Sequence, residues 1–251
     1  MKSKLLFVGA ACLLFTSVVM ADEAKPAKIK IILVGDSTVA ERTGWGPGFK
    51  QFLTDRAECI NTAAGGRSSK SFINEGKWTN ALALKGDYYL IQFGHNDEPG
   101  KGPDRETQPD TTYREYMTRY VDDARAIGAK PVLITSLVRR QWDKNGDGKI
   151  TSSLVPYVEA VKKLAAEKNV PLIDLHAGSK ELCEQLGMAK CNELSPVKTN
   201  TVDNTHLNAK GSVVFAKLVV TGLAKAVPEL APCLRETPNP VADKPKAAGG
   251  K

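Results

Sequence analysis

The chain has 251 residues, of which 42% are hydrophobic, and its 35 basic and 28 acidic side chains give a formal net charge of +7. This length can form one large hydrophobic core, and no internal repeat or mid-chain linker indicates a second folded domain. We therefore expect one folded domain, and neither a repeat protein nor a two-domain chain, and the sequence contains no nucleic-acid-binding motif.

The N-terminus predicts an export signal that is removed near Ala21. Lys2 and Lys4 precede an apolar stretch over residues 5–20, and residues 19–21 form a small-residue cleavage site. An uncleaved membrane anchor is the alternative, but roughly sixteen apolar residues are short for a membrane span. We therefore expect a secreted or periplasmic protein with a folded domain over residues 22–234 and no stable membrane association.

Apolar runs that alternate with segments of helical length predict an α/β domain with a parallel sheet. In chain order, the expected strands are residues 28–34, 57–61, 87–93, 131–136 and 171–175. The expected helices are residues 48–54, 113–127, 155–167 and 208–226. For the second helix, Asp110 or Thr111 is the expected N-cap and Gly128 the expected left-handed residue at its end.

A candidate nucleophile follows the first expected strand. Ser37 lies in Gly35-Asp36-Ser37-Thr38, directly after an apolar run, and α/β folds place catalytic residues at the carboxyl ends of parallel strands. A serine hydroxyl is a weak nucleophile, so it needs an adjacent base. No Gly-x-Ser-x-Gly elbow surrounds Ser37, which disfavours an α/β-hydrolase.

Three histidines can supply that base. His206 is favoured because Asp203 precedes it by three residues, a spacing that lets the carboxylate orient one ring nitrogen while the other faces Ser37. His176 ends an apolar run and is expected to be structural. His95 has no carboxylate at a clear orienting spacing, so we expect it to shape the pocket.

Two further segments offer hydrogen-bond donors for a developing negative charge. Gly65 and Gly66 allow positive φ, which can turn backbone N–H groups toward a ligand. A tetrahedral acyl intermediate needs two or three donors, and the N–H groups of Ser37 and Gly66 with the side-chain amide of Asn96 would supply them. Each segment alone is also typical of an ordinary turn.

Taken together and in this order, Ser37, Gly66, Asn96 and His206 resemble the four blocks of the SGNH, or GDSL-like, hydrolases. The strings GDST, AGGRSS, FGHND and DNTHLN are similar to those of the rhamnogalacturonan acetylesterase group, and the similarity spans about residues 29–227. The resemblance implies a flavodoxin-like three-layer α/β/α domain with a five-stranded parallel sheet and no metal or organic cofactor. It also implies removal of acetyl groups from pectin through an acetyl-enzyme intermediate, with Asp203 orienting His206.

Side chains near these blocks are candidates for contacts with the galacturonate carboxylates of pectin, because guanidinium groups pair bidentately with carboxylates. Without its two terminal segments the chain carries a charge of only about +3, which supports an anionic substrate weakly. Loop arginines that face solvent are the alternative. The candidate substrate contacts are Asp36, Arg67, His95, Arg139 and Arg140.

Other functions stay open at this point. A broader esterase acting on acetyl xylan, aryl or lysophospholipid esters would use the same chemistry with a different acyl pocket. A carbohydrate-binding protein with an inactive site is the alternative from another class. We expect a monomer with an acetylated polysaccharide as its substrate and no nucleic-acid partner.

Four cysteines remain after the export signal, an even number that suits disulfides in an exported protein. Of the three possible connectivities, the preferred one pairs Cys183 with Cys191 and Cys59 with Cys233. Buried free thiols are the alternative. The cysteine spacing does not indicate a zinc site.

Two other stretches are not expected to carry function. Residues 143–148 match the opening of an EF-hand loop, but Leu154 takes the place of its bidentate glutamate, so we expect a hairpin and no metal there. Residues 235–251 are rich in Pro, Ala, Gly and Lys and predict a disordered tail.

Overall fold

A five-stranded parallel sheet forms the centre of the computed structural model, which describes residues 27–235 except residue 146. Its strand order is β2-β1-β3-β4-β7. The strands are β1 (Ile29–Gly35), β2 (Ala57–Asn61), β3 (Tyr88–Gln92), β4 (Lys130–Ile134) and β7 (Leu172–Ile173). All five expected strands are present, and four of them agree with the expected bounds to within two residues at each end. The fifth is shorter than expected, because Asp174 caps the following helix and Leu175 is the first residue of that helix.

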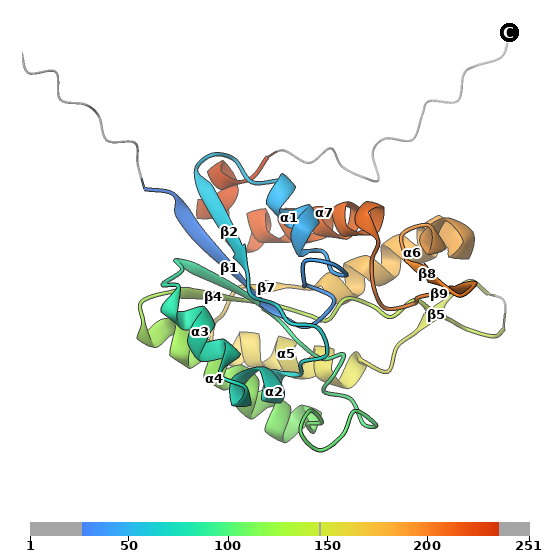
Figure 1. Ribbon diagram of the computed structural model, residues 1–251, viewed down its shortest axis with the longest axis horizontal. Coiled ribbons are helices and arrows are strands. Elements are labelled where there is room, and N and C mark those ends of the chain that lie inside the picture. The colour runs from blue at the N-terminus through green and yellow to red at the C-terminus, as the bar shows by residue number, and fades with distance from the viewer. Residues whose placement is uncertain (1–26, 146, 236–251) are drawn as a thin grey trace, which may run out of the picture.

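Helices cover both faces of this sheet (Figure 1). One face carries α1 (Gly46–Gln51), α6 (Leu175–Asn192) and α7 (Ala209–Ala226), and the other carries α2 (Ser69–Asn74), α3 (Lys77–Ala83), α4 (Arg114–Ala126) and α5 (Val155–Glu167). Successive strand residues point to opposite faces, so Ile31 and Leu33 pack into one buried cluster while Ile32 and Val34 pack into the other. The three-layer α/β/α fold is thus confirmed.

The helices agree with the sequence patterns only where those patterns are long. Helix α5 has the expected bounds, and α7 begins one residue later than expected. Helices α2 and α3 were not predicted because six or seven residues are too few to show a helical period. Helix α6 was missed as well, and its pattern is interrupted at Gly187, where the backbone leaves helical geometry with φ of 75°.

The start of α4 also differs from expectation. A π-helical turn over Pro109–Tyr113 leads directly into the helix, and Gln108 precedes that turn. Asp110 and Thr111 therefore lie inside helical backbone, and the N-cap prediction was wrong. Gly128 adopts φ of 80° after the helix, which confirms the expected left-handed end.

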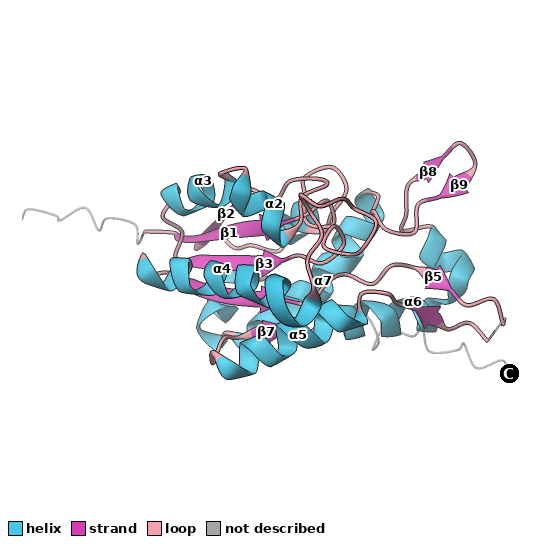
Figure 2. Cartoon of the chain, turned by 90° about the horizontal axis from the view of Figure 1, so that it is seen from below, coloured by secondary structure: helices cyan, strands magenta, loops and turns pink. Residues whose placement is uncertain are grey.

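Two small antiparallel hairpins lie beyond the ends of the sheet strands (Figure 2). The first pairs β5 (Gln141–Trp142) with β6 (Ile150–Thr151), which confirms the hairpin expected around residues 143–148. The second pairs β8 (Val197–Lys198) with β9 (Thr201–Val202) and comes directly before Asp203. A 3₁₀ helix over Pro228–Cys233 follows α7, and Leu234 after it forms an isolated antiparallel bridge with Leu53.

The ends of the chain bear on three of the sequence-based expectations. The expected export signal and residues 236–251 of the expected tail lie outside the described residues. Arg235, the first residue of that tail, is still held, because its N–H donates to Phe52 O at 2.7 Å and its Nε to Leu53 O at 2.9 Å. No helix in the described part of the chain is long and apolar enough to span a membrane.

The four described cysteines are free thiols, so the expected disulfides are not found in the structure. Cys183 and Cys191 are buried and contact each other from either side of the kink in α6. Cys233 is buried and Cys59 is half-buried, and burial raises the pKa of the Cys59 thiol to about 12. The alternative of buried thiols describes this arrangement.

Candidate active site

Ser37 lies in a tight turn directly after β1. Gly35 is required there because a Cβ at this position would lie 2.6 Å from both Gln92 O and Val39 Cγ2. The buried Asp36 carboxylate accepts hydrogen bonds from the Thr38 N–H at 2.8 Å and the Thr38 hydroxyl at 2.7 Å. These bonds close the turn and fix the backbone on both sides of Ser37.

The structure brings Ser37, His206 and Asp203 together as a hydrogen-bonded series. His206 Nε2 lies 2.9 Å from Ser37 Oγ, and His206 Nδ1 lies 2.8 Å from Asp203 Oδ2. The tautomer that satisfies both contacts carries its proton on Nδ1 and accepts the serine proton at Nε2. His206 is therefore placed to act as a general base toward Ser37.

A compact loop before α7 holds Asp203 in register with His206. The second carboxylate oxygen, Asp203 Oδ1, accepts the backbone N–H groups of Thr205 and His206, both at 2.9 Å. Partial burial alone would raise the pKa of Asp203, but these N–H groups and the His206 ring lower it to about 2. The carboxylate therefore stays ionised and can stabilise an imidazolium at His206.

Ser37, Gly66 and Asn96, which line the same cavity, each carry a possible hydrogen-bond donor for an oxyanion. Gly66 adopts φ of 77°, and within the described residues the backbone N–H groups of Ser37 and Gly66 donate to no protein acceptor. The Asn96 side chain is held by a 3.1 Å hydrogen bond from its Nδ2 to Arg67 O, which leaves the second Nδ2 hydrogen free. These groups are available to bind an oxyanion.

Ser37 opens into a cavity of about 570 Å³ at the carboxyl end of the sheet. Asp203 is not at its surface, because it lies behind His206. Within the described residues, no group of three or more His, Cys, Asp or Glu side chains is arranged to hold a metal ion. The cavity is lined by Ser37, Ala40, Glu41, Arg42, Thr43, Ala63, Gly65, Gly66, Asn96 and His206.

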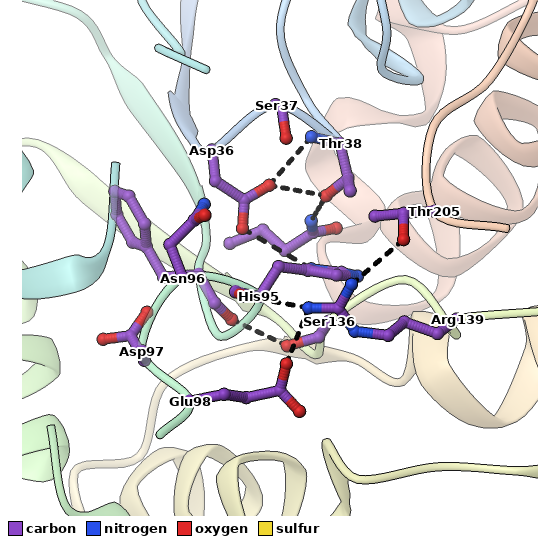
Figure 3. A network of polar contacts seen from close by, with 12 residues as sticks. Asp36, Ser37, Thr38, His95, Asn96, Asp97, Glu98, Ser136, Arg139 and Thr205 are labelled. Carbon is purple, nitrogen blue, oxygen red and sulfur yellow. Dashed lines mark hydrogen bonds and ion pairs between the residues drawn. The ribbon is translucent and has the colours of Figure 1, made fainter. Parts of the chain in front are cut away.

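Two of the expected substrate contacts instead form a buried support behind the nucleophile (Figure 3). Asp36 is fully buried, and His95, only 2% exposed, places its Nδ1 3.5 Å from Asp36 Oδ2. Burial would raise the pKa of Asp36, but contacts with His95 and Thr38 hold it below its ordinary value. Neither side chain lines the cavity, so the geometry does not support direct substrate binding by either residue.

The expected arginine contacts are also occupied within the protein. Arg139 donates to Glu98 Oε2 at 2.6 Å, His95 O at 2.9 Å and Thr205 Oγ1 at 3.0 Å, which ties the loop after β3 to the loop that carries His206. Arg67 pairs with Glu75 at 2.9 Å and donates to Gly65 O at 2.8 Å. Both guanidinium groups thus bond to other parts of the chain, Arg139 in a mostly buried position and Arg67 at the surface, and neither residue lines the cavity.

Arg140 is buried beneath the loop that carries Asp203 and His206, with only 3% of its surface exposed. Its guanidinium donates to Ser195 Oγ at 3.1 Å and to three backbone carbonyls of that loop, those of Asp203 at 3.2 Å, Thr205 at 3.4 Å and His206 at 2.5 Å. A side chain held in this way cannot reach a ligand in the cavity. Arg140 is thus a positioning residue for the Asp203–His206 pair.

The structure adds two buried residues that the sequence reasoning left without a role. Gln92 at the end of β3 donates to Thr38 Oγ1 at 2.6 Å and accepts from Trp45 Nε1 at 2.9 Å, which fastens the Ser37 turn to the sheet. Asp97 accepts from the Ser69 hydroxyl at 2.5 Å and the Thr107 hydroxyl at 3.0 Å, and burial raises its pKa to about 7. Asp97 directly follows Asn96, and that adjacency was the available signal for its role.

His176 lies away from this arrangement. It is 6% exposed, and its Nδ1 is 3.1 Å from Ser136 O. Burial lowers its pKa, which favours the neutral imidazole. The prediction of a structural histidine is confirmed.

Comparison with known proteins establishes the family. The profile of the GDSL-like Lipase/Acylhydrolase family matches residues 33–214. The chain belongs to this family. It is 39% identical over 214 residues to the rhamnogalacturonan acetylesterase RhgT of Bacillus subtilis strain 168, covering 78% of this chain and 89% of the relative. It is 31% identical over 211 residues to the rhamnogalacturonan acetylesterase of Emericella nidulans, covering 74% and 81%.

Solved structures agree with the fold of the family. The crystal structure of protein YxiM from Bacillus subtilis matches with a TM-score of 0.68 at 25% identity, covering 79% of this chain and 57% of that one. A catalytic mutant of Axe2, an acetylxylan esterase from Geobacillus stearothermophilus, matches with a TM-score of 0.59 at 15% identity, covering 77% and 93%. The resemblance to the GDSL-like hydrolases is confirmed, and this family member is a carboxylic ester hydrolase.

Proposed function

We propose that the protein removes acetyl groups from rhamnogalacturonan through an acetyl-enzyme intermediate. The observation that carries this proposal is the series from Ser37 through His206 to Asp203, with contacts of 2.9 Å and 2.8 Å, open to a cavity that also holds Gly66 and Asn96. The rhamnogalacturonan acetylesterases to which the chain is 39% and 31% identical support the choice of substrate.

In the first half of the reaction the serine is acetylated. Ser37 Oγ attacks the acetyl carbonyl carbon and gives its proton to His206 Nε2. The carbonyl oxygen becomes an oxyanion that accepts from the N–H groups of Ser37 and Gly66 and from Asn96 Nδ2. The intermediate then collapses, His206 protonates the departing sugar oxygen, and the acetyl group stays on Ser37.

In the second half, water releases acetate. His206 Nε2 removes a proton from a water molecule, whose oxygen attacks the acetyl carbon of the ester on Ser37. The same three donors bind the second oxyanion, and His206 returns a proton to Ser37 Oγ as acetate leaves. Asp203 keeps the imidazole oriented in both halves and stabilises its protonated form.

Export and a monomeric state belong to the same proposal. An acetylated cell-wall polymer is too large to reach an enzyme retained inside a cell, and the basic and apolar pattern of residues 1–21 is typical of an export signal. Mass spectrometry of the protein collected outside the cytoplasm would show a mature chain beginning near Asp22. Light scattering of that material would give the mass of one chain.

Acetate release tests the activity. The purified protein is compared with Ser37→Ala on acetylated rhamnogalacturonan, acetylated xylan and a chromogenic acetate. We expect the wild type to release acetate fastest from acetylated rhamnogalacturonan, and we expect Ser37→Ala to release none from any of the three substrates. Greater release from xylan would keep the mechanism and refute the substrate. Release by Ser37→Ala at the rate of the wild type would refute the mechanism, and binding of the polymer without release from any substrate would indicate a carbohydrate-binding protein.

A further inference from the structure

The charges around the catalytic cavity are not all balanced. Glu41 and Arg42 are charged residues in the cavity wall. Glu41 pairs with Lys50 at 2.5 Å, so its charge is compensated. Arg42 is exposed and, within the described residues, makes no hydrogen bond or ion pair. Its guanidinium is thus free to bind an anion.

The other arginines close to the site lack this freedom. Arg67 pairs with Glu75, Arg139 pairs with Glu98, and Arg140 is buried against backbone carbonyls. None of them lines the cavity. Of these four arginines, Arg42 is the one that lines the cavity and also has no ionic partner within the described residues.

The backbone that carries Arg42 is fixed relative to the reacting atoms. The Thr43 hydroxyl donates to Ser37 O at 2.7 Å, and Thr43 O accepts the N–H of Leu207, the residue after His206, at 2.9 Å. Gly44 packs so closely that a Cβ there would lie 2.4 Å from Thr38 O. The segment is therefore held between nucleophile and base, so the guanidinium starts from a defined place at the cavity wall.

We propose that Arg42 is a specificity-determining residue that binds the carboxylate of a uronic acid next to the acetylated position of the substrate. A guanidinium fork matches a carboxylate with two parallel hydrogen bonds, and it holds its charge at any working pH. The contact forms in the bound substrate and persists in the transition state, so it lowers KM and leaves kcat unchanged. This inference rests on the proposed acetylesterase activity and names the substrate group that the site selects.

Steady-state kinetics on a matched pair of substrates tests it. One substrate is an acetylated rhamnogalacturonan oligosaccharide with free carboxylates, and the other is the same oligosaccharide after methyl esterification. A chromogenic acetate, which has no carboxylate, reports the chemistry alone. The variants are Arg42→Gln, Arg42→Lys and, as control, Arg119→Gln, which removes the same charge from the exposed surface of α4, where Arg119 lies 3.4 Å from Asp123.

With the free carboxylates, we expect Arg42→Gln to raise KM about tenfold at unchanged kcat, as loss of a carboxylate–guanidinium pair does. Arg42→Lys should recover part of that loss, because an ammonium keeps the charge and loses the fork. Methyl esterification should raise the KM of the wild type similarly, and the Arg42→Gln variant should not distinguish the two substrates. With the chromogenic acetate, the loss in Arg42→Gln should be smaller than with the free carboxylates, and Arg119→Gln should behave as the wild type throughout.

Failure of this inference and failure of the proposed function give different results. If the wild type deacetylates both oligosaccharides with equal KM, or if Arg42→Gln and Arg119→Gln weaken binding equally, the role of Arg42 is refuted while the activity stands. If the wild type cleaves the chromogenic acetate and neither oligosaccharide, the proposed substrate is wrong and the role of Arg42 falls with it.

Discussion

Replacing Arg140 by methionine should disable the catalytic loop without touching a residue that faces the substrate. Arg140 donates to the carbonyls of Asp203, Thr205 and His206 from a buried position. Methionine fills much of the same volume but offers no donor, so these carbonyls lose their partner. At about 1–3 kcal/mol for each buried group left without a hydrogen bond, and with water restoring some of the contacts, we expect a loss of about 3–5 kcal/mol in the free energy of unfolding.

The same change should lower turnover. The 2.9 Å contact between Ser37 Oγ and His206 Nε2 depends on where the loop holds the imidazole. A displacement of about 1 Å at reacting groups costs on the order of a hundredfold in rate, so kcat for a chromogenic acetate should fall by about that factor. Thermal unfolding should shift by about 10 °C, since about 1 kcal/mol corresponds to roughly 2–4 °C in a domain of this size.

A matched control separates loop positioning from a general loss of stability. Arg125 also donates to two backbone carbonyls, those of Lys168 and Asn169, but it lies at the end of α4, at the opposite end of the sheet from the cavity. Arg125→Met should lose a little stability and keep the kcat of the wild type. Arg140→Lys, which keeps the charge and a single donor group, should fall between Arg140→Met and the wild type. A folded Arg140→Met protein with unchanged kcat would refute the reasoning.

Three further predictions concern single hydrogen-bonding groups. Asn96→Ala should lower kcat for a chromogenic acetate by about 100- to 1,000-fold with a small change in KM, because one oxyanion donor is lost; an unchanged kcat would exclude that role. Asp203→Asn should lower kcat by up to about 10,000-fold in the same assay, because an amide can stabilise the wrong imidazole tautomer and cannot balance an imidazolium; rates within tenfold of the wild type would contradict this. Burial raises the pKa of Asp97 to about 7, so the folded state binds this proton more tightly than the unfolded chain. Its stabilising effect is full below about pH 4 and lost as the pH rises through about 7, so urea unfolding should show lower stability at pH 8 than at pH 5. The loss should be up to about 1.4 kcal/mol for each pH unit between 5 and 7, and Asp97→Asn should remove this contribution.

Sequence patterns predicted the strands and helices that are long enough to show a periodic pattern of apolar residues. The strands of the sheet and the helix α5 carry runs of buried apolar residues, and these elements appeared at the expected positions. Helices α2 and α3 escaped detection because each has fewer than two full turns, and Gly187 interrupts α6. Local patterns cannot show a short helix whose stability comes from packing against a distant strand.

In the site, too, contacts between residues close in sequence could be predicted, and contacts between distant residues could not. Asp203 and His206 lie three residues apart, so their mutual contact could be expected from local spacing. The contacts of Arg140 join it to residues more than sixty positions away, and nothing in its own neighbourhood in the sequence distinguishes it from a solvated arginine. Arg42 could not be identified from the sequence either, because its proposed role depends on having no ionic partner in the folded protein, and a sequence does not show which charges remain unpaired.

In the sequence blocks around Ser37 and Asn96, one side chain faces the cavity and its neighbours are buried in the protein. Ser37 faces the cavity while Asp36 and Thr38 beside it are buried and bond to each other, and Asn96 faces the cavity while Asp97 is buried against α2 (Figure 3). A loop can hold one polar group toward solvent at a fixed angle only if its other polar groups are satisfied inside.

This division explains why so many charged and polar residues of the blocks do not touch the cavity. Arg139 links the backbone of His95 to the hydroxyl of Thr205, so the loop after β3 and the loop before α7 are fastened to one another behind the reacting atoms. The proposed reaction depends on the fixed distance between Ser37 and His206, because a hydrogen bond of 2.9 Å weakens steeply when either partner moves. The buried polar contacts are therefore as much a part of the catalytic apparatus as the residues that meet the substrate, and substitutions there should appear in kcat before they appear in KM.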